Sequence, residues 1–532
     1  MNVALLAVAV AALLTAALAR RLNWSAPLLL VPVGLAGSQI PGLPDTALDP
    51  DLVMFAVLPP LLYSAALDSS SLALRRNARA IGLLAVGLPL ATTAVVGVVA
   101  YLTIPEFPLA AALVLGAVVA PPDAVSASAI GRRLGLPRRI MTLLGGESLL
   151  NDATALTAYR VALAAAVGTG VTLLEGVRTF LGAAVGGTLI GLGVGIVVAV
   201  IRSRLTDPVM ESAIGLVVPF VAYLAAEEVH GSGVIAVVVA GLYLGQRSTR
   251  AGYATRLQDT AVWKAVDVVL ESFVFLLIGL QLPSVVQGLH GRSVAEVIGA
   301  SIAVLAAVIA VRLLWVYPAT YLPRLLSVRI REREPAPPPR GVFVVAWSGM
   351  RGVVSLAAAF AIPLTVNSGA PFPGRDMILF ITFAVVVGTL LLHGLTLPWL
   401  ITRLGVDNEE ERRKDALSLA AAQDKAARAA TELLDSLVAN ADGDPAAVRE
   451  RAAEILRTWS EHRAHAAWER LGRSEAELGE SPSAAFRALR LQMLDTERGV
   501  FVAERDNGRI DDEVLRQVLR ELDLEEATLN RE

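Results

Sequence analysis

A group of polar side chains that could bind an ion interrupts an apolar part of the chain, in the segment GGESLLNDATAL at residues 145–156. Glu147 and Asn151 are four residues apart, as are Ser148 and Asp152. Side chains four residues apart lie on one face of an α-helix, so these two pairs form neighbouring stripes. One stripe can therefore pack against another helix while the other faces a cavity.

Two further segments bring polar groups into apolar sequence. In VVAPPDAVSAS, Pro121 and Pro122 precede Asp123, and in WSGMRGVVS, Arg351 has a glycine close by on each side. The prolines remove two backbone donors and break a helix, and non-helical backbone is tolerated in a membrane only against protein or a cavity. The glycines indicate a second break. Two interrupted helices that meet at the membrane centre are typical of secondary transporters.

The carboxylates of the first segment are expected to have different roles. Charges within hydrocarbon are costly and by default mark an ion or substrate path. Arg351 is the expected counter-ion of Glu147, with Asn151 adding a hydrogen bond, which leaves Asp152 without a permanent cation. Because desolvation disfavours a bare buried anion, we expect H+ and a small cation to compete for Asp152.

A hard cation such as Na+ requires oxygen ligands. Ser148 Oγ, the backbone carbonyls freed near Pro122, and water are expected to complete the shell around Asp152. Asp123 either contacts the ion or caps the restarted helix, and the sequence leaves both alternatives open.

Other charges within apolar runs are expected to be structural. Glu227, Glu228 and Arg312 are placed near span ends, where long side chains reach the interface. Lys264 and Asp267 are expected to form an i,i+3 ion pair near the start of their helix.

The composition predicts an all-α polytopic membrane protein. The 532 residues are 55% hydrophobic and 18% charged, and the mean hydropathy is +0.60. A span needs about 20 apolar residues, and many such runs occur. The absence of cysteine excludes disulfides and thiolate metal sites. We expect thirteen spans, at residues 3–19, 24–40, 51–68, 80–102, 108–130, 137–165, 176–201, 208–227, 231–246, 260–282, 293–317, 341–365 and 376–402.

The loop charges predict the orientation. Arginines concentrate in alternate loops, and positive residues mark the cytoplasmic side. The N-terminus is therefore expected outside and the C-terminus in the cytoplasm, with the first apolar segment a spanning helix rather than a cleaved signal peptide. These expectations place an antiporter-like transmembrane domain at 1–404 and a charged cytoplasmic helical regulatory domain at 405–532. In the latter, His462 and His465 could sense pH, but the expectation is that they are ordinary surface residues.

Several motifs resemble those of the cation/proton antiporter-1 family, the sodium/proton exchangers. GGESLLNDATAL is similar to the family's GESLxND signature, and APPDAV, LPPLLYSAAL, FLLIGLQL and WSGMRGVVSLAAAFAIP resemble its other motifs. The resemblance covers about residues 1–405 and implies a bacterial member with two crossing broken helices, inverted repeats and a homodimer.

By this resemblance Asp152 binds the cation or proton, and Ser148 is a cation ligand. Glu147, Asn151 and Arg351 resemble the family's structural ion-pair cluster. The Asn-Asp pair at 151–152, where electrogenic relatives have two aspartates, implies electroneutral exchange. Two positions depart from the pattern. Pro122 stands where many members have threonine, and Ser64, a possible accessory position, stands where many have an acidic residue.

The sequence thus favours a Na+/H+ antiporter in the plasma membrane, with K+/H+ exchange as the alternative. A cation channel would need a pore of repeated weak sites, which one buried acid does not supply.

An intramembrane hydrolase would need a nucleophile and a base, but the one histidine within an expected span, His393, is far along the chain from Ser148. Asp123 and Asp152 could mimic the two aspartates of an aspartyl protease, but their flanking motifs do not resemble such proteases. We therefore expect no enzyme activity and no catalytic residues. We also expect no cofactor and no nucleic-acid partner. A purely structural polar network would explain Glu147, Asn151 and Arg351 but would leave Asp152 unpaired.

Overall fold

The computed structural model consists of helices, with an isolated bridge between Thr365 and Pro371 in its described part. The structure describes residues 2–22, 26–40, 53–168, 173–205, 207–248, 251–289, 293–334, 336–406, 408–439, 450–458, 482–507, 509–510 and 512–531. His462 and His465 lie outside these residues. Contacts divide the chain into two units, Met1–Asp407 and Asn408–Glu532.

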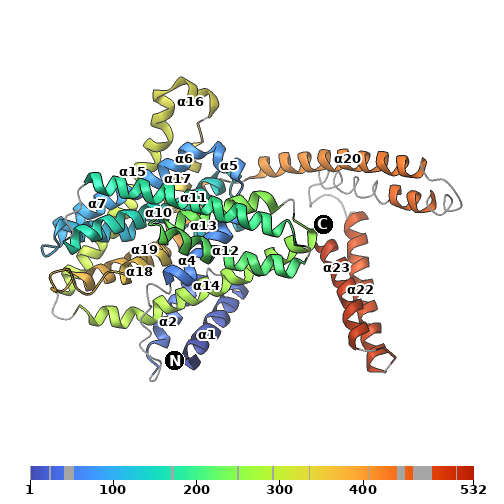
Figure 1. Ribbon diagram of the computed structural model, residues 1–532, viewed down its shortest axis with the longest axis horizontal. Coiled ribbons are helices and arrows are strands. Elements are labelled where there is room, and N and C mark those ends of the chain that lie inside the picture. The colour runs from blue at the N-terminus through green and yellow to red at the C-terminus, as the bar shows by residue number, and fades with distance from the viewer. Residues whose placement is uncertain are drawn as a thin grey trace. The chain divides into compact units, whose positions relative to one another are not determined.

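Each of the thirteen expected spans contains helix in its described residues, and two of them, the fifth and the twelfth, are interrupted. Figure 1 labels many of these helices. In chain order the elements are α1 (Asn2–Arg21), α2 (Ala26–Gly37), the π-helix η1 (Val53–Val57) with α4 (Leu58–Leu67), α6 (Ala78–Gly82) with the π-helix η2 (Leu83–Gly87) and α7 (Leu88–Thr103), α8 (Leu109–Val119) with α9 (Ala124–Leu134), α10 (Arg138–Val167), α11 (Leu173–Arg202), α12 (Pro208–Glu228), α13 (Gly233–Arg247), α14 (Tyr253–Gln287), α15 (Val294–Leu326), α17 (Pro339–Trp347) with α18 (Val353–Phe360), and α19 (Arg375–Leu404). The short helices α5 (Ser71–Arg76) and α16 (Val328–Arg333) lie in connections.

Six described helical stretches are both long and apolar enough to cross a bilayer. They are Ala78–Thr103, Glu175–Arg202, Pro208–Glu228, Tyr253–Gln287, Val294–Leu326 and Arg375–Leu404. Several others, among them α2, α8 and α13, are shorter apolar helices. The protein is therefore a multi-pass membrane protein, while the total of thirteen crossings and the inverted repeats stay predictions.

The packing of α14 against α2 in the first unit depends on glycine. A Cβ atom at Gly279 of α14 would collide with the carbonyl oxygen of Val31 in α2, and one at Gly34 would collide with that of Leu276. Small residues allow helix backbones to approach this closely in a membrane, where there is no hydrophobic force between helices. Gly279, within the FLLIGLQL motif, and Gly34 thus allow α14 to pack closely against α2.

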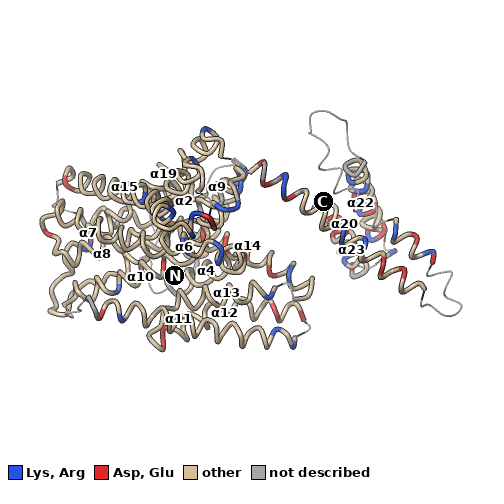
Figure 2. Tube along the Cα trace, turned by 90° about the horizontal axis from the view of Figure 1, so that it is seen from above, with Lys and Arg blue, Asp and Glu red and all other residues tan. Residues whose placement is uncertain are grey.

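Charge is distributed differently in the two units. In Figure 2 the helices of the first unit are mostly uncharged, with Lys, Arg, Asp and Glu concentrated towards helix ends and loops. The second unit contains α20 (Glu409–Ala439), α22 (Pro482–Asp506) and α23 (Asp512–Arg531), all rich in both signs of charge. Helices α22 and α23 are joined by ion pairs such as Arg490 with Glu525, at 2.6 Å.

Candidate functional site

Two broken helices contact each other in the first unit. The helix of the fifth expected span ends at Val119 and resumes at Ala124, and that of the twelfth ends at Trp347 and resumes at Val353. The peptide N–H of Asp123 donates to the carbonyl of Met350, at 2.7 Å. The two breaks expected from the prolines and the glycines are thus present and joined directly through their backbones.

Arginine side chains satisfy the carbonyls that the breaks expose. Arg351 Nε donates to the carbonyl of Val119, the last residue of α8, at 3.2 Å, and its Nη1 donates to the carbonyl of Gly349. Arg312 Nη2 donates to the carbonyl of Val345 near the end of α17, at 3.1 Å. Cations are favourable at helix C-termini, where carbonyls lack partners within the helix. Each broken helix therefore has an arginine at the end of its first half.

The counter-ion of Glu147 is Arg312, and the prediction that it is Arg351 was wrong. Arg312 Nη1 and Nη2 donate to the two carboxylate oxygens of Glu147 at 2.5 and 2.9 Å. Both residues are 1% exposed. Arg312 was expected near a span end, but α15 continues to Leu326, which places this arginine well inside the helix.

Asn151 also differs from its expected role. Its Nδ2 donates to the carbonyl of Pro122, at 2.7 Å, and the side chain is fully buried. Asn151 therefore connects α10 to the break between α8 and α9 rather than to Arg351. The expected cluster of Glu147, Asn151 and Arg351 is instead two separate links, one to α15 and one to the break.

Asp152 is buried, with 7% of its surface exposed. Within the described part of the chain it has no ion pair and no hydrogen bond. The charged group that acts on it electrostatically is a second carboxylate, Asp123. Ser148, one turn earlier on α10, is partly buried. The structure thus leaves Asp152 without a fixed cation.

The carboxylate of Asp123 lies against the start of α18. A Cβ atom at Gly352, the N-cap of α18, would lie 2.6 Å from Asp123 Oδ2. A carboxylate at a helix N-terminus is favoured by the free N–H groups there. This position supports a structural role at α18, in addition to the proximity of Asp123 to Asp152.

The polar residues of α14 are arranged differently from the prediction. Asp267 Oδ2 accepts a hydrogen bond from Ser64 Oγ of α4, at 2.6 Å. Among the described residues Asp267 has no ion pair with Lys264, which is exposed. The predicted ion pair between Lys264 and Asp267 is therefore absent among the described residues. The observed partner of Asp267 is Ser64. Glu227, by contrast, pairs with Arg160 at 3.0 Å in a more exposed position.

Sequence reasoning misplaced Arg312 and did not identify Thr389. Thr389 of α19 accepts from the peptide N–H of Arg351 at 3.0 Å. His393 of α19, 2% exposed, has its ring centroid 5.1 Å from that of Trp347. Arg312 carried a usable signal, because it is the sole charged residue between Glu296 and Arg324. Thr389 carried none.

Two broken helices that contact each other at their breaks, with buried charged residues beside them, are typical of the class of polytopic secondary transporters. The fold is similar to the sodium proton antiporter MjNhaP1 from Methanocaldococcus jannaschii, with a TM-score of 0.60 and 19% identity over 75% of this chain and 97% of that one.

Comparison with known sequences identifies the family. Residues 8–403 match the family model described as sodium/hydrogen exchanger, transmembrane. An uncharacterised Na+/H+ exchanger of Mycobacterium tuberculosis is 33% identical over 99% of this chain and 96% of its own. The sodium, potassium, lithium and rubidium/H+ antiporter of Bacillus subtilis is 32% identical over 70% of this chain and 57% of its own. The chain therefore belongs to the sodium/hydrogen exchanger family, whose members are cation/proton antiporters.

Proposed function

We propose that this protein exchanges one Na+ for one H+ across the plasma membrane by alternating access, with both ions competing for Asp152. The observation that carries the proposal is the charge arrangement around the breaks. Arg312 forms an ion pair with Glu147, and Arg351 donates hydrogen bonds to backbone carbonyls. Asp152 is buried beside another carboxylate with no fixed cation among the described residues. An anion in that position requires a bound proton or cation.

The ligands of the cation follow from what surrounds Asp152. Ser148 lies one helical turn away on α10, and Asp123 acts electrostatically on Asp152. The carbonyl of Pro122 accepts one hydrogen bond from Asn151 and keeps a second lone pair. These oxygens, with water, suit a hard monovalent cation. In this proposal the metal site is Asp152 with Ser148, and Asp123 and Pro122 are further ligands.

Electroneutral exchange requires that a single group changes its charge in each cycle. Asn151 is neutral and committed to Pro122, and the Glu147–Arg312 pair carries no net charge. Exchange of H+ for Na+ on Asp152 then leaves the charge of the site unchanged.

Because the fifth and twelfth expected spans are an odd number of spans apart, their broken helices run in opposite directions, as inverted repeats require.

Potassium is the competing cation. The name of the Bacillus subtilis relative includes sodium, potassium, lithium and rubidium, so relatives of this chain are not restricted to one ion. A channel is less well supported, since a single enclosed carboxylate provides one site rather than a row of weak ones.

We further propose a homodimer in which residues 1–404 transport the ions and residues 405–532 form a cytoplasmic regulatory domain.

Purified protein in lipid vesicles tests this function. A pH-sensitive dye inside the vesicles reports proton movement after Na+, Li+ or K+ is added outside. The proposal predicts saturable proton movement that needs a cation gradient, is largest with Na+, and keeps the same rate when a membrane potential is imposed. Cation flux without coupled proton movement would contradict it and would support a channel.

A further inference from the structure

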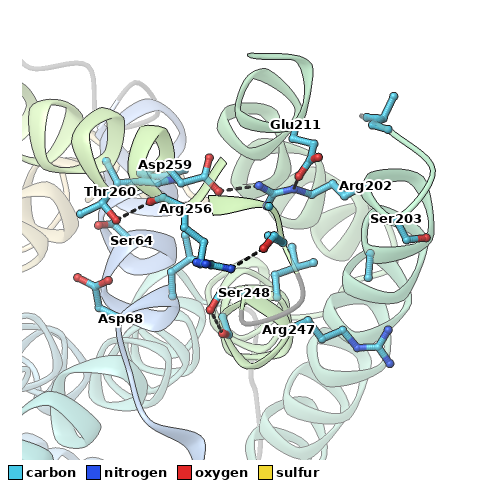
Figure 3. A pocket seen from close by; sticks show the side chains of 18 of the residues that line it. Ser64, Asp68, Arg202, Ser203, Glu211, Arg247, Ser248, Arg256, Asp259 and Thr260 are labelled. Atoms are coloured by element: carbon cyan, nitrogen blue, oxygen red, sulfur yellow. Dashed lines mark hydrogen bonds and ion pairs between the residues drawn. The ribbon is translucent and has the colours of Figure 1, made fainter. Parts of the chain in front are cut away.

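The charges that line a cavity in the first unit are balanced. Four acidic and four basic side chains border this cavity of about 560 Å³ (Figure 3). Arg202 pairs with two of the acids, because its Nη2 lies 2.6 Å from Asp259 Oδ2 and its Nε 3.9 Å from Glu211 Oε2. The cavity therefore shows no preference for a ligand of either charge. A surface that does lack a partner lies in the second unit, on α22.

One face of α22 is covered by α23. The two helices lie side by side (Figure 1), and Arg490 of α22 pairs with Glu525 of α23 at 2.6 Å. Leu494 of α22 and Leu515 of α23 are buried, with 1% and 7% of their surfaces exposed. The contact between the helices thus uses the face of α22 that carries Arg490 and Leu494.

A different face of α22 carries an exposed apolar stripe. Phe486, Leu489, Met493 and Val500 are 64%, 62%, 54% and 55% exposed. Together with two small exposed residues they follow each other at intervals of three and four residues, at positions 486, 489, 493, 496, 500 and 503. This spacing is that of the a and d positions of a heptad repeat, which pack against a second helix. The stripe is therefore built to contact another helix.

The charges of α22 and α23 disfavour a membrane surface as the partner of this stripe. Helix α22 carries four basic and four acidic residues, and α23 carries three basic and six acidic residues. Amphipathic helices that bind membranes are rich in Lys and Arg, because the cytoplasmic leaflet is negatively charged. A pair of helices with a net charge of −3 is repelled by such a surface.

The apolar side chains of the stripe complement those of a second copy when the two α22 helices run antiparallel. In that arrangement a positions lie opposite d positions, so Phe486 lies opposite Ala503 of the second copy, and Leu489 lies opposite Val500. Large side chains then face smaller ones, which allows dense packing. In a parallel pair Phe486 would instead face Phe486.

The charged side chains at the edge of the stripe favour the same antiparallel pair. Arg490 and Glu497 both occupy e positions of the heptad, and within one chain they pair at 2.8 Å. Antiparallel helices bring e positions next to each other, so Arg490 of each copy lies beside Glu497 of the other. In a parallel pair Arg490 would lie beside Ala485, which carries no charge.

We propose that α22 pairs with α22 of a second copy of this chain, in antiparallel orientation, through the stripe that extends from Phe486 to Ala503. The stripe is about 25 Å long and a helix about 10 Å wide, which is less than the roughly 800 Å² that each partner of a stable complex buries. Tethering by the membrane domains raises the effective concentration of α22 to about the millimolar range. The inference thus rests on the proposed homodimer, and it does not depend on which cation is transported.

The test is disulfide cross-linking of full-length protein in lipid vesicles, since a chain without cysteine gives no background. The double variant Leu489→Cys/Val500→Cys should form a cross-linked dimer after oxidation. Each single variant should give at least about fivefold less, because an antiparallel pair separates identical positions by more than a disulfide can bridge. Asp495→Cys, which is exposed but lies off the stripe, is the matched control. Adding Met493→Glu to the double variant should reduce the cross-linked fraction about fivefold.

A double variant that cross-links no more than Asp495→Cys would overturn the inference, as would equal cross-linking of the single variants, which indicates parallel helices. Protection of Phe486→Cys from a water-soluble maleimide only when lipid is present would show that the stripe binds the membrane, and would also overturn it. The mass of wild-type protein in detergent separates the two proposals. A monomer contradicts the homodimer itself, whereas a dimer without cross-links contradicts the pairing of α22 alone.

Discussion

Arg312 of α15 and Glu147 of α10 form a bidentate ion pair in the interior of the first unit. Arg312 Nη1 lies 2.5 Å from Glu147 Oε1, and Nη2 lies 2.9 Å from Oε2. Arg312 also donates to the carbonyl of Val345 beside the break in the twelfth expected span. One side chain therefore joins α10, α15 and α17. Because the pair neutralises itself, it can hold the helices around Asp152 without competing for the transported ion.

We expect Arg312→Met to be strongly destabilising, because it leaves Glu147 buried without a counter-ion. Breaking one partner of a buried pair costs about 3–5 kcal/mol, whereas replacing both partners is often much less harmful. The double variant Arg312→Met/Glu147→Gln should therefore melt at a higher temperature than either single variant. Thermal unfolding in detergent measures this. The exposed pair of Arg160 and Glu227 is the control, and Arg160→Ala should cost about 1 kcal/mol at most. Equal melting temperatures for the single and double variants would argue against the pair.

Arg351 should contribute to stability more than to cation affinity. Arg351→Met removes the donors to the carbonyls of Val119 and Gly349, and each buried group left unsatisfied costs about 1–3 kcal/mol. We expect a clear loss in melting temperature, with the apparent KM for Na+ of the folded fraction changed by less than about twofold. A variant with normal stability would show that these contacts do not hold the breaks together.

The close approach of α2 and α14 predicts sensitivity to a single methyl group. Gly279→Ala places a Cβ atom on the carbonyl of Val31, and overpacking of this kind typically costs about 1–3 kcal/mol. The matched control is Gly193→Ala in α11, where a Cβ atom meets nothing within 4 Å. There the better helix propensity of alanine should leave stability unchanged or raise it slightly. Similar melting temperatures for the two variants would contradict the packing.

The contact between α6 and the end of α16 should depend on pH. The hydrogen bond from Arg79, together with the nearby charge of Arg324, holds the pKa of the Glu334 carboxyl below its ordinary value. Arg79 Nη2 lies 2.7 Å and Arg324 Nη2 3.2 Å from Glu334 Oε2.

A lowered pKa in the folded state means that the stabilisation is complete above the unfolded pKa and is lost as the pH falls through the folded pKa. We expect Glu334→Gln to lower stability by about 1 kcal/mol above about pH 5, with the difference from wild type shrinking as the pH falls below the ordinary glutamate pKa of about 4.3 and through the lower pKa of the folded state. Melting temperatures measured from about pH 5 downwards test the trend. A difference that grows as the pH falls would have the wrong sign.

The breaks and the exceptional position of Asp152 could be predicted from the sequence because they are local. Two adjacent prolines disrupt any helix, and an acid inside an apolar segment is conspicuous whatever packs against it. The pairing of Glu147 could not be predicted in the same way. Arg312 and Arg351 both lie in apolar segments, and the choice between them depends on where α15 and α17 pass α10 in space.

The wrong counter-ion for Glu147 was predicted because the helix that contains Arg312 is longer than expected. The apolar run was expected to end at residue 317, which placed Arg312 near its end, but α15 extends through two prolines to Leu326. The link between Ser64 and Asp267 was missed for a related reason. An i,i+3 spacing suggested Lys264 as the partner of Asp267, whereas a residue of another helix supplies the hydrogen bond. Local spacing identifies candidate pairs, and tertiary packing decides between them.

The most direct test of the account is Na+-driven proton movement in vesicles that contain Asp152→Asn, whose asparagine can neither release a proton nor carry the charge that binds Na+. We predict that exchange falls to the level of empty vesicles, while the melting temperature shows that the protein stays folded. Exchange at a rate close to wild type in the Asp152→Asn protein would contradict the central claim that H+ and the cation compete for this carboxylate.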